Sequence, residues 1–281
     1  MPQPEHTLPY FDQLLQHLKA GDPELERCFG RHVHWGYWPD PAVSATQARQ
    51  SYATAAEALT TEMLNLAAIH HGDAVLDVGC GFGGTVALLN EQQQGLNLTG
   101  VNLDPRQLER ASRRVQASNG NQIQWISADA CALPLASASQ DLVLAVECIF
   151  HFPSRDRFLA EVRRVLRPGG RLVLSDFVPV APLAWLLRRR GNTRLHTPTY
   201  GPVDCSWGWR QYRERGLLQG LELLHNRNIT ANTLPTYGVV TALFDAMGWP
   251  AATADTARIA QLSRAGLLRY RLLCFRRLAD G

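Results

Sequence analysis

The chain has 281 residues, of which 46% are hydrophobic and 19% are charged, and its formal net charge is +3. This composition excludes a disordered, collagen-like or coiled-coil protein, because the apolar content is ordinary and no short repeat is present. The length allows one large domain or two small ones. The most apolar stretch, residues 172–187, is too short to cross a bilayer and is interrupted by Asp176, Pro179 and Pro182. No transmembrane segment is therefore expected.

Cysteine usage and the N-terminal residues predict a cytoplasmic protein. Six cysteines are scattered along the chain without a C-x-x-C pair, which is typical of reduced thiols rather than of a disulfide framework or a zinc site. No bound metal is expected. The N-terminal residues lack the basic-then-apolar pattern of a signal peptide.

Charge is unevenly distributed along the chain. Residues 1–175 carry a net charge of −4, and residues 176–281 carry +7. Nucleic-acid-binding modules have a denser basic patch interleaved with aromatic side chains, so no nucleic-acid partner is expected. The basic run at residues 188–190 is interpreted as a solvated helix end. Contact with a membrane surface or an anionic substrate is the alternative interpretation.

Residues 1–70 are predicted to form a helical cap. Ser44 is a suitable N-cap for a helix over residues 45–69, and an aromatic loop spans residues 32–39. From residue 73 strands and helices alternate, which is typical of a parallel sheet covered by helices on both faces. The predicted strands are Ala74–Val78, Leu98–Leu103, Gln122–Ile126, Leu142–Val146, Arg171–Ser175, Leu221–Asn226 and Tyr270–Phe275.

The helices that follow these strands have recognisable ends. Asp104 is a predicted N-cap with Pro105 at the first helical position, and Gly120 is predicted to stop that helix. The stretches 177–206 and 232–267 are longer than a plain crossover needs, so they are predicted to be lid insertions in a sheet domain over residues 71–281. Further helices are predicted from about Gly84, over Arg155–Leu166 and Trp207–Leu218, and between Pro235 and Leu267.

The segment Asp77–Gly84 places four glycines between a predicted strand and a predicted helix. Glycines there let backbone N–H groups approach a ligand, and the helix N-terminus favours an anion. The segment fits the dinucleotide pattern G-x-G-x-x-G through Gly79, Gly81 and Gly84. It also fits G-x-G-x-G, which ends at Gly83. The turn alone favours neither pattern.

Residues after the next two strands distinguish the two patterns. A nicotinamide enzyme needs an acidic residue at the end of the second strand to bind the ribose diol, whereas this chain has Asn102 there. Asp129 follows the third strand, where a carboxylate suits the exocyclic amine of adenine. The backbone N–H of Ala130 suits a ring nitrogen. Together they predict an adenine site and disfavour a nicotinamide-dependent oxidoreductase.

With these residues the chain resembles the class I S-adenosylmethionine-dependent methyltransferases over roughly residues 30–280. The resemblance implies an α/β, Rossmann-like, mostly parallel seven-stranded sheet whose last strand is antiparallel, with helices on both faces, and S-adenosylmethionine as cofactor. Within this class the chain is similar to macrolide and glycoside O-methyltransferases and to tocopherol-type C-methyltransferases. Each motif is weak alone, but the set is specific: Asp77–Gly84, Gly100–Gln107, Asp129–Ala130 and Leu166–Asp176.

The resemblance also implies which residues bind the cofactor. Asn102 departs from the acid found in many relatives, but small-molecule enzymes with asparagine or threonine at this position are similar to this chain. Three neighbouring aromatic residues, Trp35, Tyr37 and Trp38, either wall the sulfonium or form an ordinary satellite core. The implied contacts are Tyr37, Asp77, Gly79, Gly81 and Gly83 for the methionine part, Asn102, Leu103 and Gln107 for the ribose, and Asp129 and Ala130 for adenine.

Candidate catalytic residues lie after the fourth and fifth strands, where they would be next to the cofactor. His151 has the proton affinity of a general base at neutral pH, and Asp176 is predicted to orient its imidazole. Glu147 is a third candidate. Instead of catalysis, His151 could cap a helix, and Glu147 could hydrogen-bond to the N-terminal region or to the cofactor's ammonium group.

These residues predict methyl transfer to a small, partly apolar molecule, at a hydroxyl oxygen and with His151 as general base. C-methylation of a quinone, sterol or isoprenoid is the second hypothesis, in which Glu147 would shield a cation. A nicotinamide-dependent oxidoreductase and an inactive cofactor-binding partner subunit are hypotheses from different classes of protein. The sequence leaves the acceptor's identity and the oligomeric state open.

Overall fold

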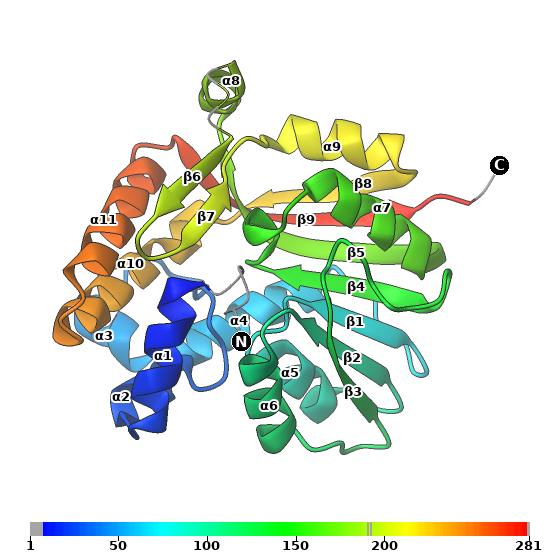
Figure 1. The fold of residues 1–281 in the computed structure, drawn as a ribbon, viewed down its shortest axis with the longest axis horizontal. Coiled ribbons are helices and arrows are strands. Elements are labelled where there is room, and N and C mark those ends of the chain that lie inside the picture. Colours follow the sequence, from blue (N-terminus) through cyan, green and yellow to red (C-terminus); the bar gives the residue numbers. More distant parts are fainter. Residues whose placement is uncertain (1–7, 190, 192, 280–281) are drawn as a thin grey trace, which may run out of the picture.

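A computed structural model describes residues 8–189, 191 and 193–279. Its main sheet has seven strands: β1 (Ala74–Val78), β2 (Asn97–Asn102), β3 (Gln122–Ser127), β4 (Gln140–Val146), β5 (Leu166–Pro179), β8 (Leu221–Asn228) and β9 (Leu268–Arg277). Their order is β3-β2-β1-β4-β5-β9-β8 (Figure 1). β9 runs antiparallel to both of its neighbours, and the remaining pairs are parallel. This confirms the predicted Rossmann-like fold with a reversed last strand.

Side chains that alternate along the strands build two cores, one on each face of the sheet. Leu76 and Val78 of β1 belong to the first core, and Val75 belongs to the second. The first core is covered by α7 (Arg155–Val165) and α9 (Trp209–Leu218), whereas α4 (Tyr52–Leu64) and α5 (Gly84–Gln92) cover the second. A further helix, α6 (Pro105–Arg114), packs against β2 and β3. The sheet is therefore buried between helices, as predicted.

A third core joins the N-terminal helices to the late helices of the chain. It contains buried apolar residues from α1 (Pro9–Lys19), α2 (Pro23–Phe29), α3 (Ala45–Gln50), α10 (Thr230–Ala246) and α11 (Pro250–Arg264). Figure 1 shows these five helices together beside the sheet. The predicted cap over residues 1–70 thus shares its core with the second predicted lid insertion, while α4 packs on the sheet.

The stretch 177–206 contains α8 (Ala181–Arg189) and a hairpin of β6 (Arg194–Thr197) and β7 (Gly201–Asp204), which the sequence analysis did not predict. α8 projects away from the molecule in Figure 1. The hairpin is attached to α1 of the cap, because Tyr10 N donates to Thr199 O at 3.1 Å, and to α11, because the Tyr200 and Thr256 hydroxyls are 2.8 Å apart. The hairpin therefore bridges the sheet and the cap.

Helix boundaries follow local caps at some positions and tertiary contacts at others. Ser44 caps α3 in a capping box with Gln47, as predicted, but the expected helix over 45–69 is divided into α3 and α4. The prediction that Gly120 stops the helix after Pro105 is wrong, since α6 ends at Arg114. Asn90 holds the following segment through hydrogen bonds to Gln116 O and Ser118 N, which compete with further helix.

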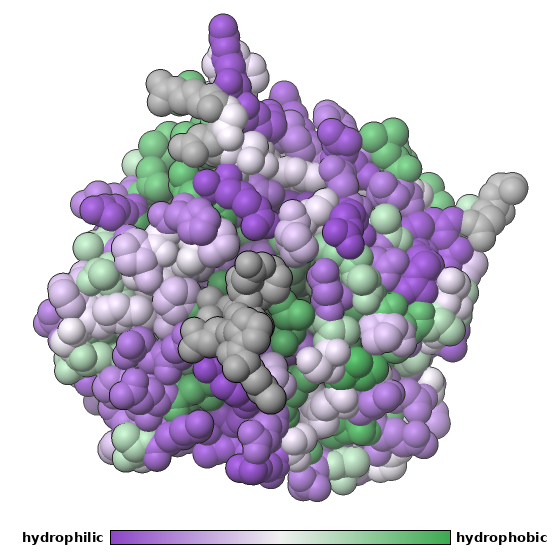
Figure 2. All heavy atoms as spheres, viewed as in Figure 1, coloured by the Kyte–Doolittle hydropathy of each residue, from purple (hydrophilic) through white to green (hydrophobic). Residues whose placement is uncertain are grey.

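Whether a protein can span a membrane depends on the hydropathy of its surface and on the lengths of its helices. Figure 2 shows many hydrophilic side chains around the rim of the face that is viewed. No helix within the described ranges combines the length and apolar character needed to span a bilayer. Residues 1–7 of the predicted cap and residue 190 of the basic run lie outside the described residues.

Candidate active site

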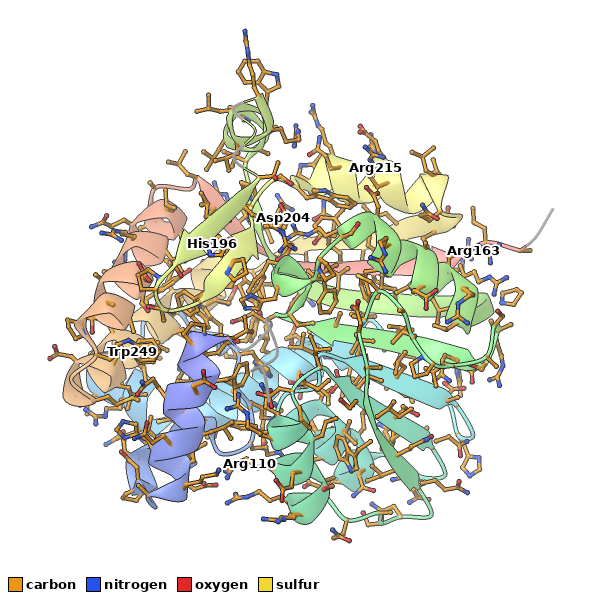
Figure 3. All side chains as sticks on the ribbon, viewed as in Figure 1. Arg110, Arg163, His196, Asp204, Arg215 and Trp249 are labelled. Atoms are coloured by element: carbon orange, nitrogen blue, oxygen red, sulfur yellow. The ribbon has the colours of Figure 1, made fainter. Side chains whose placement is uncertain are left out.

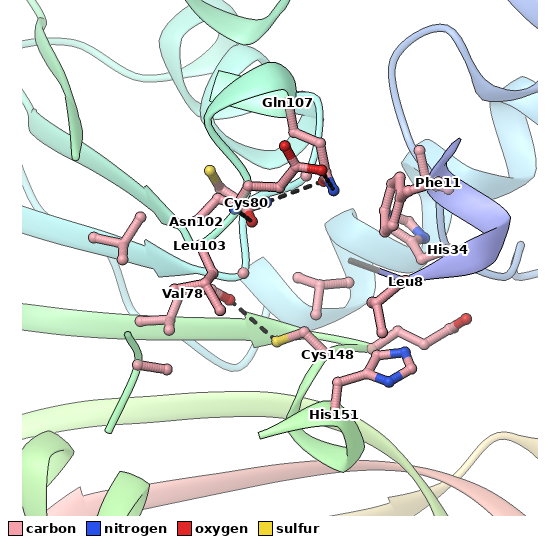
Figure 4. Close-up of a pocket in the computed structure, with 18 of the residues that line it drawn as sticks. Leu8, Phe11, His34, Val78, Cys80, Asn102, Leu103, Gln107, Cys148 and His151 are labelled. Carbon is pink, nitrogen blue, oxygen red and sulfur yellow. Dashed lines mark hydrogen bonds between the residues drawn. The ribbon is translucent and has the colours of Figure 1, made fainter. Parts of the chain in front are cut away.

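A cavity of about 360 Å³ opens at the carboxyl edge of the sheet, where β1, β2 and β4 end (Figure 4). The strand order reverses there, because β2 and β3 lie on one side of β1 and β4 and β5 lie on the other, and open α/β sheets bind ligands at such a point. The loop after α2, the start of α1 and the β6–β7 hairpin complete the wall. The sequence-predicted residues on the wall are Asp77, Gly79, Gly81, Asn102, Leu103, Gln107, Asp129, Ala130, Glu147 and His151.

The glycine turn after β1 forms one wall, and its glycines have different physical roles. Gly79 has a φ of +70°, and a Cβ there would lie 2.7 Å from the Cβ of Cys148. Gly81 also has a positive φ and lines the cavity. Gly83 does not line it: its φ is +80°, and a Cβ there would lie 2.7 Å from the Trp125 ring. The prediction of a cofactor contact at Gly83 is therefore corrected to close packing at the start of α5.

Asp77 is a buried carboxyl group at the base of this turn. Neither of its side-chain oxygens has a hydrogen-bond partner among the described residues. Burial raises the pKa of Asp77 to about 8. Buried carboxyl oxygens without partners are costly, so this position suits a ligand group that brings a positive charge and N–H donors.

Polar groups at the ends of β2 and β3 form a second wall. Asn102 Nδ2 donates to Gln107 Oε1 at 3.1 Å, and both side chains lie across the cavity from His151 in Figure 4. Leu103 also lines the wall and is 46% exposed. Asp129 Oδ1 accepts a hydrogen bond of 2.8 Å from Cys131 N, which fixes the loop after β3.

Glu147 follows β4 and connects three segments. Its φ is +50°, and its Oε2 accepts hydrogen bonds from Trp35 N at 3.0 Å and from the Tyr270 hydroxyl at 2.6 Å. Burial raises the pKa of Glu147 to about 8. The structure therefore shows the bond to the N-terminal region that the sequence analysis gave as an alternative to catalysis.

The aromatic loop packs differently from the cofactor wall that the resemblance implied. Tyr37 is not among the residues that line the cavity; its backbone N–H donates to Ala55 O. Trp35 packs at right angles to the rings of Phe177 and Tyr237. The prediction of a cofactor contact at Tyr37 is thus corrected, because the loop packs Trp35 and Tyr37 against the core and places residues 32–34 on the cavity.

His151 lies on the cavity wall at the end of a short 3-10 turn, Ile149–His151. Its Nδ1 is 3.4 Å from Pro202 O of the hairpin, and its Nε2 is buried without a partner among the described residues. Because a carbonyl oxygen can only accept, Nδ1 carries the proton and Nε2 carries a lone pair. Burial lowers the pKa of His151 to about 4, so the imidazole is neutral at pH 7.

Asp176 does not orient His151 directly, and that prediction is wrong. Its Oδ2 accepts hydrogen bonds from Arg155 Nη2 at 2.9 Å and from the Tyr212 hydroxyl at 2.5 Å. The side chain is fully buried and does not line the cavity. The physical reason is strand alternation, which points position 176 of β5 toward the face covered by α7 and α9.

Several wall residues were not recognised in the sequence. Tyr10 of α1 stacks on His151 with ring centroids 6.1 Å apart, and Arg194 of β6 also lines the cavity. No sequence signal connects position 10 with position 151. His32 and His34 had a signal in their spacing of two residues, and their rings share a 3.0 Å hydrogen bond beside the cavity.

The fold and this cavity define a Rossmann-like enzyme that binds a nucleotide-type cofactor at the carboxyl edge of its sheet. A family model described as a methyltransferase domain matches residues 76–174. The chain is 32% identical to the methyltransferase GfsG of Streptomyces halstedii over 239 residues, which are 85% of this chain and 80% of that protein. The chain therefore belongs to the S-adenosylmethionine-dependent methyltransferases of small molecules, and S-adenosylmethionine is its cofactor.

A further relative agrees with this family, and a solved structure agrees with the fold. The chain is 34% identical to the 27-O-demethylrifamycin SV methyltransferase of Amycolatopsis mediterranei (strain S699) over 163 residues, which are 58% of this chain and 57% of that protein. The crystal structure of the [4+2]-cyclase SpnF has a TM-score of 0.72 at 23% identity and covers 97% of this chain and 94% of that chain. At this identity the structural likeness shows the fold. The family excludes the nicotinamide-dependent hypothesis.

Proposed function

We propose that the enzyme methylates a hydroxyl oxygen of a small, partly apolar molecule, with His151 as the general base. The observation that carries this proposal is the buried Nε2 of His151 on the cavity wall, which has no partner among the described residues. A hydroxyl group is the ligand group that would both donate to this lone pair and present an oxygen for methylation. The rifamycin-pathway relative, whose name states a 27-O-demethyl acceptor, supports methylation at oxygen.

The cofactor would be held along the wall opposite the base. S-adenosylmethionine supplies an electrophilic methyl group on a positively charged sulfur. We assign its ammonium group to Asp77, because that buried carboxyl group has no other partner among the described residues. Asn102 and Gln107 would bind the ribose hydroxyls. Asp129 and the backbone of Ala130 would bind adenine, since both line the cavity after β3.

His151 would act in its neutral form. The Pro202 carbonyl keeps the ring proton on Nδ1, so Nε2 can accept the hydroxyl proton as the oxygen–carbon bond forms. Tyr10 packs over the imidazole and buries it, which keeps water away from the reacting oxygen. Aligning hydroxyl, methyl and sulfur in one line would be the task of the cavity walls.

The walls around His151 indicate the kind of acceptor. Leu8, Phe11, Phe152 and Pro202 present apolar surface, whereas Arg194 is the basic residue of the hairpin on this wall. A molecule with a hydrocarbon framework and a few polar groups fits this lining best. In C-methylation Glu147 was the candidate carboxylate for shielding a cation, and its carboxyl group binds other segments of the chain.

The test uses methyl-labelled S-adenosylmethionine with an extract of the source cells. We expect label in the organic phase, and ether cleavage of the isolated product should release it as a labelled methyl halide. His151→Gln should lower turnover by about 10²–10⁴-fold while the cofactor's Kd stays unchanged. Unchanged turnover in His151→Gln would contradict the base assignment. Label that resists ether cleavage would contradict O-methylation.

A further inference from the structure

A buried ion network lies beneath the β6–β7 hairpin. The Arg155 side chain is 1% exposed, and its Nη2 is 2.9 Å from Asp176 Oδ2. Its Nη1 is 2.6 Å from Asp204 Oδ2 and donates to Asp204 O at 3.0 Å, while its Nε donates to the Tyr212 hydroxyl at 2.9 Å. One guanidinium group thus joins α7, β5, α9 and the end of β7. Figure 3 labels Asp204 between the hairpin and α9.

Such a network holds its members in defined positions. A guanidinium group removed from water is tolerated only where its N–H groups have partners, so each bond restrains the others. Asp204 also accepts hydrogen bonds from Ser206 N and Ser206 Oγ, which fix the backbone that leaves β7. The base of the hairpin therefore cannot move without breaking a buried ion pair.

The hairpin carries the backbone group that contacts His151. Pro202 lies two residues before Asp204 in the four-residue strand β7, and its carbonyl oxygen faces His151 Nδ1. At the other end of the hairpin, Thr199 N donates to Asp255 Oδ2 at 3.3 Å. The bond between Arg155 and Asp204 thus helps to set the position of the Pro202 carbonyl, together with the hydrogen bond that Arg194 of β6 donates to Phe152 O.

We infer that Arg155 is a positioning residue for methyl transfer: it holds β7 so that the Pro202 carbonyl fixes His151 in the tautomer that has a lone pair on Nε2. This inference rests on the proposed role of His151 as base. Asp176 contributes through Arg155 rather than by touching the imidazole. The sequence suggested that Asp176 acts on His151. In the structure this link is indirect and passes through Arg155 and β7.

The experiment reads the tautomer of His151 by ¹⁵N NMR of histidine-labelled protein at pH 7. His151→Gln identifies the signal by removing it. In the parent protein we expect Nδ1 to be protonated and Nε2 to be unprotonated. In Arg155→Met the signals should shift toward the tautomer protonated on Nε2, which imidazole prefers in water. Turnover should fall about 10–100-fold, with an unchanged cofactor Kd, because only the base is misplaced.

Arg164→Met is the matched control. Arg164 also lies on α7 and also binds a carboxylate and backbone carbonyls, those of Glu161, Leu133 and Leu135, but it does not contact the hairpin. It should leave the His151 signals unchanged. If Arg155→Met does not fold, Asp204→Ala tests the same link: it removes the ion pair between Arg155 Nη1 and the Asp204 carboxylate and leaves the bond from Nη1 to the Asp204 carbonyl, so we expect a smaller shift of the His151 signals in the same direction.

The outcomes separate this inference from the proposed function. Unchanged His151 signals in folded Arg155→Met would overturn the inference whatever the activity, and so would the absence of any shift in Asp204→Ala where Arg155→Met does not fold. A shifted tautomer with unchanged turnover would overturn the role of Arg155 in methyl transfer and would remove His151 as the base. A shifted tautomer with reduced turnover, and neither effect in Arg164→Met, is the expected result.

Discussion

Asp77 and Glu147 are two buried carboxyl groups on the same cavity wall, with different hydrogen-bond environments. The oxygens of Asp77 have no partner among the described residues, whereas Glu147 Oε2 accepts from Trp35 N and the Tyr270 hydroxyl. Burial raises the pKa of both groups to about 8. Only Asp77 therefore needs a ligand to satisfy it, which is why we assign the cofactor's ammonium group to it.

Cofactor binding is expected to release a proton from Asp77. Its folded pKa of about 8 lies above the ordinary value of 3.8, so it is uncharged at pH 6.5, and an adjacent ammonium group would favour the carboxylate. Calorimetric titration with S-adenosylhomocysteine at pH 6.5 should give different binding enthalpies in phosphate and in imidazole buffer. The difference should equal the difference between the ionisation enthalpies of the two buffers for about one proton, because the buffer takes up the proton that Asp77 releases. Asp77→Asn should weaken binding and remove the difference. Equal heats for the parent protein would contradict this prediction.

The raised pKa of Asp77 also makes a prediction about stability. A group whose folded pKa is raised contributes stability at low pH, and this contribution is lost as pH rises through the folded pKa, here about 8. The protein without cofactor should therefore lose stability toward urea between pH 6 and pH 9. Asp77→Asn should reduce that loss. A variant with the same pH dependence as the parent protein would show that another group is responsible.

The turnover number should be lost as pH falls, because His151 must be neutral to act as a base. Burial, together with the nearby charges of Arg194 and Arg155, lowers its pKa to about 4, and the ring also faces Tyr10. The neutral base is then present above pH 5 and is lost as pH falls toward 4. We expect a kcat that is flat from pH 6 to pH 8. A fall in kcat between pH 7 and pH 6 would contradict a buried neutral His151.

At the scale of elements, the start of α5 shows how one glycine turn serves both packing and binding. Gly79 and Gly81 line the cavity, whereas Gly83 allows the Trp125 ring to lie against the backbone. Gly84 is also crowded, since a Cβ there would lie 2.5 Å from His32 Nδ1. The glycine motif therefore satisfies two requirements, access for a ligand and close packing. The sequence pattern does not show which glycine serves which requirement.

Gly83→Ala should separate these constraints. The φ of +80° strains any residue with a side chain, and the new Cβ would clash with Trp125, so we expect a loss of about 2–4 kcal/mol in the free energy of unfolding. Gly21 has the same φ of +80° but open space around it, so Gly21→Ala measures the backbone cost alone, about 1 kcal/mol. Urea unfolding gives both values. Equal losses would show that Trp125 moves freely.

At the scale of the whole molecule, the cavity is built from parts that are distant in sequence. Its wall takes residues from α1, the loop after α2, four strand ends and the β6–β7 hairpin. The cap helices share a core with α10 and α11, and the hairpin is hydrogen-bonded to both α1 and α11. The cap, the β6–β7 hairpin and the sheet should therefore respond to the cofactor as one unit.

Cofactor binding is expected to stabilise the whole chain in a single transition. S-adenosylhomocysteine at about 100 times its Kd should add about 2.7 kcal/mol to the free energy of unfolding, because it binds only the folded state. Scanning calorimetry should show one peak that moves to higher temperature, and NAD should leave it in place. Two peaks, of which only one moves, would show that the cap and the sheet unfold separately.

Local patterns in the sequence determined the sheet, the glycine turn and the residues after each strand. The reason is physical: short apolar runs, N-caps such as Asp104 and glycines with positive φ act within a few residues of themselves. Eight of the ten predicted cofactor residues line the cavity. They lie at or after the carboxyl ends of predicted parallel strands, and the carboxyl ends of parallel strands meet at one edge of a sheet.

Only the tertiary structure decided the direction of side chains and the contacts between distant segments. Asp176 binds Arg155 because the alternation of side chains along β5 points it to that face of the sheet. Tyr37 does not line the cavity because the aromatic loop packs it against the core. Tyr10 and the hairpin reach His151 across more than a hundred and about fifty residues, respectively. Such contacts depend on the packing of whole elements, which no local pattern encodes.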